Sequence, residues 1–327
     1  LLFTPAPNAF GTEVFRVELV DDGGQDSNGR NVSDAVFVTI TVFPVNDPPV
    51  FALHTSHIVI LEDAGPQVFL GAVTDSVSGG YGEEDQLVSF TITHVSGARL
   101  KYQSWPLVEV NTSNGTTPDS GDLSFNLQED ENGVEVLRVT ASDSGGTDRG
   151  GNPIFSLLLT LEVISVNDAP FFMLAPVLAV PEDKYSVQPY QSAVALTLVS
   201  KGAENEAPQE LYFTFELIGG DDGFLHDINI EELDGRWMLM FQTEQNMFGI
   251  ANYSVQAMDD GGTINGGVDT STAFNFTLMV EPVNDPPEFN APTLYLCEDP
   301  EDGETYVIQR HITDILPGWH EDEQTVS

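Results

Sequence analysis

The sequence contains a single cysteine, Cys297, among 327 residues. No internal disulfide can form, so each small domain must be held together by an apolar core or by a bound metal. Cys297 itself is interpreted as a buried small hydrophobe, with a link to another chain as the alternative. Apolar residues make up 41% of the chain, which is enough for such cores and excludes a disordered polypeptide.

Basic residues are also scarce, since 10 Lys and Arg stand against 52 Asp and Glu and the formal net charge is −42. This balance excludes nucleic acid and an anionic membrane surface as partners, because phosphate groups are bound by clustered Lys and Arg. Two interpretations of the acidic excess stay open. The carboxylates form a solvated surface suited to salty water, or some of them bind cations, above all calcium, which takes several hard oxygen ligands.

Long hydrophobic runs and catalytic motifs are missing as well. The longest apolar run, residues 154–166, is too short to span a bilayer and contains Glu162, so no membrane insertion is predicted for this segment. The chain has no H-E-x-x-H, G-x-S-x-G or phosphate-loop pattern. Only His54 and His57 lie close together, which argues against a zinc site. We therefore expect a non-enzymatic segment.

What the sequence does contain is a repeated string, Val-Asn-Asp-x-Pro. Its three asparagines, Asn46, Asn167 and Asn284, are separated by 121 and 117 residues, about the length of a small domain. A Gly-rich turn precedes each string and a Glu-Asp pair follows it. The turns are VDDGG (20–24), SDSGG (142–146) and MDDGG (258–262), and the pairs are Glu62-Asp63, Glu182-Asp183 and Glu298-Asp299. Matches at nearly fixed offsets indicate an internal repeat.

Between these markers, apolar and polar residues alternate with a period of two. Before each linker the predicted inward residues are Val36, Val38, Ile40 and Val42, then Leu157, Leu159, Leu161 and Val163, then Phe274, Phe276, Leu278 and Val280. No stretch shows a sustained helical period. Short strands broken by Gly, Asn, Asp and Pro about every ten residues predict an all-β fold made of β-sandwich domains.

The markers divide the chain into four parts. Residues 1–45 are predicted to be the C-terminal part of a domain, 46–166 and 167–283 two complete domains, and 284–327 the N-terminal part of another. The two end fragments together lack roughly thirty residues of a repeat. There is no initiator Met and no signal-peptide pattern, and unpaired strand edges would invite aggregation, so we expect the natural chain to continue.

Residues 137–172 resemble the closing strands and linker of a cadherin domain, in which an A-x-D-G-G turn is followed by a strand and D-x-N-D-N-x-P. VPED at 180–183 is similar to the opening of the next cadherin domain, and VTD at 73–75 to its A-T-D. Residues 10–24 are more similar to the cadherin-like repeats of bacterial and algal surface proteins. The resemblance implies tandem Ig-like Greek-key β-sandwiches arranged as an extracellular rod.

The resemblance also implies calcium at each domain junction, with oxygen ligands from both sides forming a clamp. One or two ions per junction are expected, because no second Asp follows Asp75 or Asp314 in a D-x-D pattern. At the position of Asp75 and Asp314, the third repeat has only Glu204 and Glu206, which makes the second junction the poorest in ligands. In the alternative, the same Asn, Asp and Gly residues only form turns. The predicted ligands are Asn46, Asp47, Asp75 and Asp143; Glu62, Asn167, Asp168 and Asp259; and Glu182, Asn284, Asp285 and Asp314.

Five N-x-S/T sequons mark candidate N-glycosylation sites, at Asn31, Asn111, Asn114, Asn252 and Asn275. The period of two turns Asn252 and Asn275 toward solvent, since each alternates with inward aromatic residues. N-glycans are expected if the source has a eukaryotic secretory pathway, whereas the sequons carry no meaning in a bacterium.

These features predict a calcium-rigidified adhesion or structural rod within a large cell-surface protein. An alternative with the same architecture is a protomer of an extracellular filament or surface hair, glycan-coated and stacked head to tail. An alternative of another class is a spacer region of a large secreted enzyme or lectin. The expected partners are other copies of the chain or neighbouring repeats, and carbohydrate.

Overall fold

The computed structural model describes residues 2–111, 119–182, 190–294, 308–309 and 311–317. Asn114, Asp183, Cys297, Glu298 and Asp299 lie outside these residues. The chain forms two compact units, Leu1–Ser165 and Val166–Ser327, and each is described by itself. Within the described ranges, all regular structure is β-strand apart from four short 3-10 helices. The predicted all-β fold is therefore confirmed.

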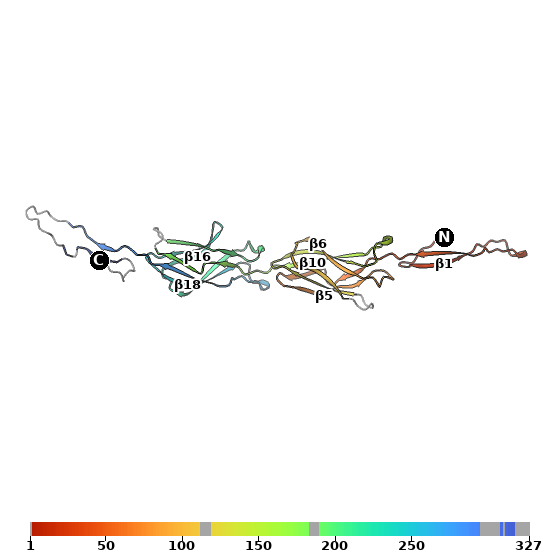
Figure 1. The fold of residues 1–327 in the computed structure, drawn as a ribbon, viewed down its shortest axis with the longest axis horizontal. Helices are drawn as coiled ribbons and strands as arrows, with labels where there is room; N and C mark the ends of the chain where they lie inside the picture. The colour runs from red at the N-terminus through yellow and green to blue at the C-terminus, as the bar shows by residue number, and fades with distance from the viewer. Residues whose placement is uncertain (1, 112–118, 183–189, 295–307, 310, 318–327) are drawn as a thin grey trace, which may run out of the picture. The chain divides into compact units, whose positions relative to one another are not determined.

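Unit 1 contains a sandwich of two four-stranded sheets (Figure 1). One sheet has the order β4-β10-β9-β6 and the other β3-β5-β8-β7. Neighbouring strands such as β5 and β8 are not consecutive in the chain, so the connections cross between the sheets in the Greek-key manner. The strands are β3 (Val50–Leu53), β4 (His57–Leu61), β5 (Gln67–Val77), β6 (Ser89–Gly97), β7 (Tyr102–Asn111), β8 (Asp119–Leu127), β9 (Gly133–Ser142) and β10 (Ile154–Ile164).

Unit 2 repeats this arrangement. Its larger sheet has the order β12-β19-β18-β15, and β13-β17-β16 and β11-β14 form the other strand groups. The parallel pair at the sheet edge recurs, because β12 runs beside β19 as β4 does beside β10. The strands are β11 (Phe171–Met173), β12 (Val177–Pro181), β13 (Tyr190–Ala195), β14 (Leu198–Ser200), β15 (Leu211–Gly220), β16 (Leu225–Leu233), β17 (Arg236–Thr243), β18 (Gly249–Asp259) and β19 (Phe274–Glu281).

Alternation along the strands builds each core. In unit 1, Leu137, Leu159 and Leu161 point inward and are buried, whereas the intervening Leu158 is exposed. In unit 2, Phe276 and Leu278 occupy the corresponding buried positions. These side chains supply most of the favourable free energy of folding, because apolar area removed from water stabilises the folded state.

Two short pieces flank the sandwiches. The strands β1 (Gly11–Val17) and β2 (Val36–Val42) pair as a hairpin in unit 1, and β20 (Glu288–Asn290) pairs with β21 (Thr313–Leu316) in unit 2. The hairpin begins with the pairing Gly11–Val42, and the two sandwiches repeat it as Gly133–Val163 and Gly249–Val280. The same register at three places is a structural counterpart of the sequence repeat.

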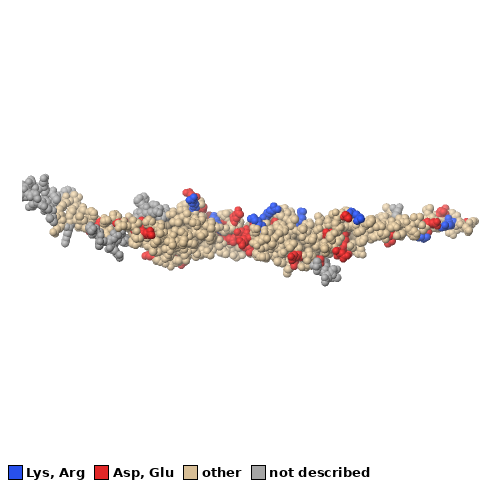
Figure 2. Space-filling view, in the orientation of Figure 1, with Lys and Arg blue, Asp and Glu red and all other residues tan. Residues whose placement is uncertain are grey.

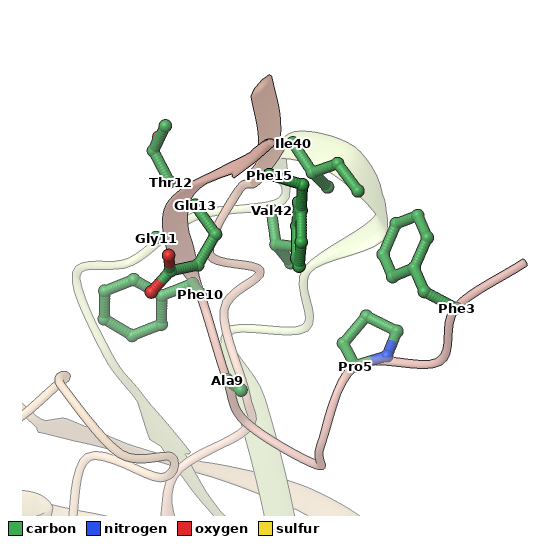
Figure 3. Close-up of a pocket in the computed structure, with 10 residues that line it drawn as sticks. All are labelled: Phe3, Pro5, Ala9, Phe10, Gly11, Thr12, Glu13, Phe15, Ile40 and Val42. Atoms are coloured by element: carbon green, nitrogen blue, oxygen red, sulfur yellow. The ribbon is translucent and has the colours of Figure 1, made fainter. Parts of the chain in front are cut away.

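The apolar face of this hairpin lines an open groove of about 390 Å³ (Figure 3). Phe15, Ile40 and Val42 gather there, at the positions that Leu137, Leu161 and Val163 occupy in the sandwich. Phe15 is 48% exposed and Leu137 is 1% exposed. The difference follows from packing, because a second sheet faces β9 and β10 in the sandwich.

The unit 1 sandwich also buries an ionisable cluster. Glu135 on β9 is 0% exposed, and its two carboxylate oxygens bond to His94 Nδ1 on β6 and to the Tyr102 hydroxyl on β7, both at 2.6 Å. The pKa of Tyr102 is raised above its ordinary value, mainly by burial of the hydroxyl and secondly by its hydrogen bond to Glu135. The equivalent position in unit 2 is the buried Ala251, so unit 2 lacks the glutamate of this cluster.

This cluster predicts a pH dependence at high pH. The folded state holds the Tyr102 proton more tightly than the unfolded chain, so this contribution to stability is complete below about pH 10 and is lost as the pH rises further. Relative to the wild type, Tyr102→Phe should flatten the fall in unfolding free energy above about pH 9. Denaturant titrations of the full chain at several pH values measure the unfolding free energy. The control is Tyr81→Phe, because Tyr81 is 74% exposed. If the unfolding free energy fell equally steeply with pH in the wild type and in Tyr102→Phe, the prediction would be wrong.

Candidate metal centres at the linkers

The first linker is attached to the sandwich that follows it through Asn46. The Asn46 carboxamide donates to Asp143 Oδ1 at 3.0 Å and to the Asn152 carbonyl at 3.1 Å, and its oxygen accepts from Gln86 Nε2 at 2.9 Å. The Asn46 carbonyl also accepts from the Asn152 amide at 3.0 Å. These bonds join the linker to two loops that follow β5 and β9.

The second linker repeats this network inside unit 2. Asn167 donates to Asp259 Oδ1 at 2.9 Å and to the Val268 carbonyl at 2.8 Å, and it accepts from Gln209 Nε2 at 2.6 Å. The Val268 amide donates to the Asn167 carbonyl at 2.8 Å. The linker asparagine and the turn aspartate therefore form a bonded pair in both units.

A buried glutamate holds the next linker residue in each case. The Asp47 amide donates to Glu83 Oε1 at 3.2 Å, and the Asp168 amide donates to Glu206 Oε1 at 2.9 Å. The other oxygen of each glutamate accepts a backbone amide of its own loop, from Gly80 or Ala203. The glutamates thereby fix the backbone of the linker through its amides.

The glycines of the turns make room for the linker. A Cβ placed on Gly145 would lie 1.7 Å from Asn46 Oδ1, and a Cβ on Gly261 would lie 1.7 Å from Asn167 Oδ1. No side chain fits there, which explains the first glycine of both turns. Gly146 and Gly262 have φ near +80°, which explains the second.

Each network leaves buried oxygens without a hydrogen bond. Among the described residues these include Asp143 Oδ2 and Gln86 Oε1 in unit 1, and Asp259 Oδ2 and Gln209 Oε1 in unit 2. A buried carboxylate oxygen is costly unless a donor or a metal satisfies it. Carboxylate and amide oxygens are the ligands that calcium prefers, so these residues fit a calcium ion.

The glutamate and glutamine that hold each linker were not among the residues predicted from the sequence. They form an E-x-x-Q pattern, Glu83 to Gln86 and Glu206 to Gln209, which recurs in the sequence from Glu321 to Gln324. The glutamates follow their linker asparagines by 37, 39 and 37 residues. This pattern was available in the sequence, although it matches no cadherin ligand motif quoted above.

Asp75 lies apart from the first network. It has a φ of 55°, its side chain is exposed, and its carboxylate accepts the Thr74 hydroxyl at 3.2 Å. Asp314 is also exposed, with a φ of 52°, and accepts the Thr313 hydroxyl at 3.2 Å. The neighbouring Ser76 is buried instead. These two aspartates therefore share a local conformation that turns them toward solvent.

Other predicted ligands lie at the ends of β4 and β12. Glu62 is buried in unit 1, where Asn132 donates to it at 3.1 Å. Beside it, the Asp130 amide donates to Asp63 Oδ1 at 3.1 Å, and carboxylate oxygens of the two aspartates lie within 4.8 Å of each other. This end of unit 1 thus gathers three acidic side chains.

In unit 2, Glu182 occupies the position that corresponds to Glu62. It is buried and accepts the Val283 amide of the third linker at 2.7 Å. In that linker, Asn284 donates to the Asp285 carbonyl at 3.1 Å, and Asp285 is half-buried. Carboxylates are exposed over both units on the face shown in Figure 2.

The sequons occupy different environments. Asn31 is half-buried and accepts from Gln25 at 2.9 Å, and Asn111 is exposed at the end of β7. Asn275 on β19 is exposed as predicted, whereas Asn252 on β18 is only half-exposed. No described helix has the length and apolar character needed to cross a membrane.

The two units share one sheet order and one linker network, so the chain is a tandem array of β-sandwich repeats. The chain is 32% identical to mouse protocadherin-16 over 196 residues, which is 58% of this chain and 5% of that protein. No family model matches. The human desmocollin-1 ectodomain has 16% identity and a TM-score of 0.35, covering 89% of this chain and 51% of that one. The protocadherin gamma-B4 extracellular domain has 17% identity and a TM-score of 0.41, covering 87% and 41%.

The close approach of the turn glycine to the linker predicts a large effect of one methyl group. Gly145→Ala should displace Asn46 and lower the unfolding free energy by about 1–3 kcal/mol, the usual cost of overpacking. Gly23→Ala is the matched control, because a Cβ there would meet only Asp21 within 4 Å. Denaturant titrations of the full chain compare the two variants. Equal stability of Gly145→Ala and wild type would show that Asn46 is not confined.

Proposed function

We propose that this segment is a calcium-stiffened extracellular rod with an adhesive or load-bearing role in a larger surface protein. One observation carries the proposal. Both sandwiches bind their linker asparagine with the same turn aspartate, and both leave the second oxygen of that aspartate, Asp143 Oδ2 or Asp259 Oδ2, buried and without a hydrogen bond. A turn that served only the backbone would not need this oxygen.

Calcium would draw on the acidic groups of each linker and of the repeats that it joins. The linker asparagines are already held by hydrogen bonds, so the ion needs little further ordering of the chain. Glu83, Gln86, Glu206 and Gln209 support or extend the set predicted from the sequence. That set is Asn46, Asp47, Asp75 and Asp143 at the first junction, Glu62, Asn167, Asp168 and Asp259 at the second, and Glu182, Asn284, Asp285 and Asp314 at the third.

Electrostatics gives the reason for stiffening. Without a cation, the carboxylates near a linker repel one another, and a bound divalent ion converts this repulsion into attraction. Extracellular modules bind calcium with dissociation constants of roughly 10⁻⁴–10⁻³ M. One or two ions per junction, as the sequence predicts, would then stabilise the folded chain by mass action.

Calcium should raise the melting temperature of the full chain, because it binds the folded state in preference to the unfolded state. At a hundredfold excess over the dissociation constant, one site contributes about 2.7 kcal/mol. Asp143→Asn and Asp259→Asn should each remove part of this gain. Asp21→Asn is the matched control, since Asp21 forms the same turn bond, to the Gly23 amide at 2.9 Å, but holds no linker asparagine. An equal calcium response in all three variants would refute the assigned ligands.

Stiffening is tested separately by small-angle scattering of the full chain. We expect a larger maximum dimension and a narrower distribution of distances with calcium than with a chelator, because the ion would restrict each joint. Magnesium at the same concentration controls for ionic strength. Identical scattering curves with calcium and with chelator would exclude a calcium-stiffened rod even if the ion raised the melting temperature.

A further inference from the structure

Two sequons face each other on the outer surface of the large sheet of unit 2. On β18 and β19, Asn252 pairs with Thr277, and Ser254 pairs with Asn275. The acceptor asparagine of each sequon therefore lies opposite the hydroxyl residue of the other. Asn252 and Asn275 are diagonal neighbours on one face, a spacing of about 7–8 Å in antiparallel sheets.

The fold already uses the side chain of Asn252. Its carboxamide oxygen accepts the Thr277 hydroxyl at 2.7 Å. Its nitrogen lies 3.4 Å from the position that a Cβ would take on Gly219 of β15, so the amide rests against the neighbouring strand. A sugar on this nitrogen would push the side chain away from the sheet and break the bond to Thr277.

Asn275 has a different setting. It is exposed near the start of β19, where Phe274 and Phe276 on either side turn toward the core. The edge strand β12 pairs with β19 only from Val177, which lies opposite Thr277. No strand residue of β12 therefore flanks Asn275, and its amide nitrogen can extend into solvent with a bulky group attached.

The other repeats differ at these positions. The pair Ser254–Asn275 corresponds to Arg138–Leu158 in unit 1 and to Arg16–Phe37 in the hairpin. Leu158 is 52% exposed and Phe37 is 65% exposed. The position that is an exposed apolar residue in two repeats is thus the acceptor asparagine of a sequon in the third, although nothing in the core requires the change.

We propose that Asn275, and not Asn252, carries an N-linked glycan. In the transfer, the Asn275 amide nitrogen forms a bond to C1 of the first sugar of a lipid-pyrophosphate-linked oligosaccharide. The bond from C1 to the pyrophosphate oxygen breaks, the lipid pyrophosphate leaves, and the amide loses one proton to a base. The glycan stands on the outer face of the large sheet of unit 2 and keeps that face from serving as a protein contact. The proposal relies only on passage through a eukaryotic secretory pathway.

The full chain, secreted from a eukaryotic host, tests this directly. Enzymatic deglycosylation in heavy-oxygen water converts each occupied asparagine to a labelled aspartate, which peptide mass spectrometry locates. We expect label at Asn275 in most molecules and at Asn252 in few. An unlabelled Asn275, or equal labelling of the two asparagines, would overturn the proposal and leave the calcium-stiffened rod untouched.

Variants distinguish the loss of a glycosylation sequon from a disturbance of the fold. Asn275→Gln should remove the mass of one glycan from unit 2, and Asn252→Gln should leave it in place. Thr277→Ser keeps the sequon of Asn275 and a hydroxyl that can bond to Asn252, so the glycan occupancy of Asn275 should match the wild type. Thr277→Val removes the sequon and should leave Asn275 without a glycan. If a variant is not secreted, the wild-type and Thr277→Ser peptides still decide the outcome.

Discussion

The structure depends on the carboxamide of the linker asparagine, which fills the space above a turn glycine and bonds to the turn aspartate. Asn46 with Gly145 and Asn167 with Gly261 repeat this contact at closely similar distances. Because the asparagine belongs to the linker and the aspartate lies almost a full domain later, the contact ties the entry of each sandwich to its last hairpin. The spacing of the repeat follows from this closure.

The same contact orders the acidic groups around the linker. The buried glutamates take the backbone amides, and the asparagine takes one oxygen of the turn aspartate, so a single carboxylate oxygen per turn is left over. In a chain with a net charge of −42, a divalent cation is the natural complement of that oxygen. Under the proposed function, the stability of the turn and the affinity for a cation would be coupled through one side chain.

Outside the core and the linkers, the repeats diverge. Glu135 with His94 and Tyr102 is replaced in unit 2 by Ala251, and Leu158 gives way to Asn275. A sandwich constrains its inward residues by packing, while its outer face accepts almost any side chain that stays solvated. Each repeat can therefore acquire its own surface chemistry, such as a glycan, without changing the fold.

The sequence by itself determined the all-β fold, because period-two alternation is a local signal. The resemblance to cadherin linkers grouped Asn46 with Asp143 and Asn167 with Asp259, and the structure shows that each pair is bonded. Only the tertiary structure revealed the role of Glu83 and Gln86. Their E-x-x-Q pattern recurs in the sequence, but their role depends on contacts between this loop and the linker, which the pattern does not encode. The tertiary structure also showed that Asp75 has a left-handed backbone and an exposed side chain. Burial and contact between distant segments are decided by packing, which a linear pattern does not contain.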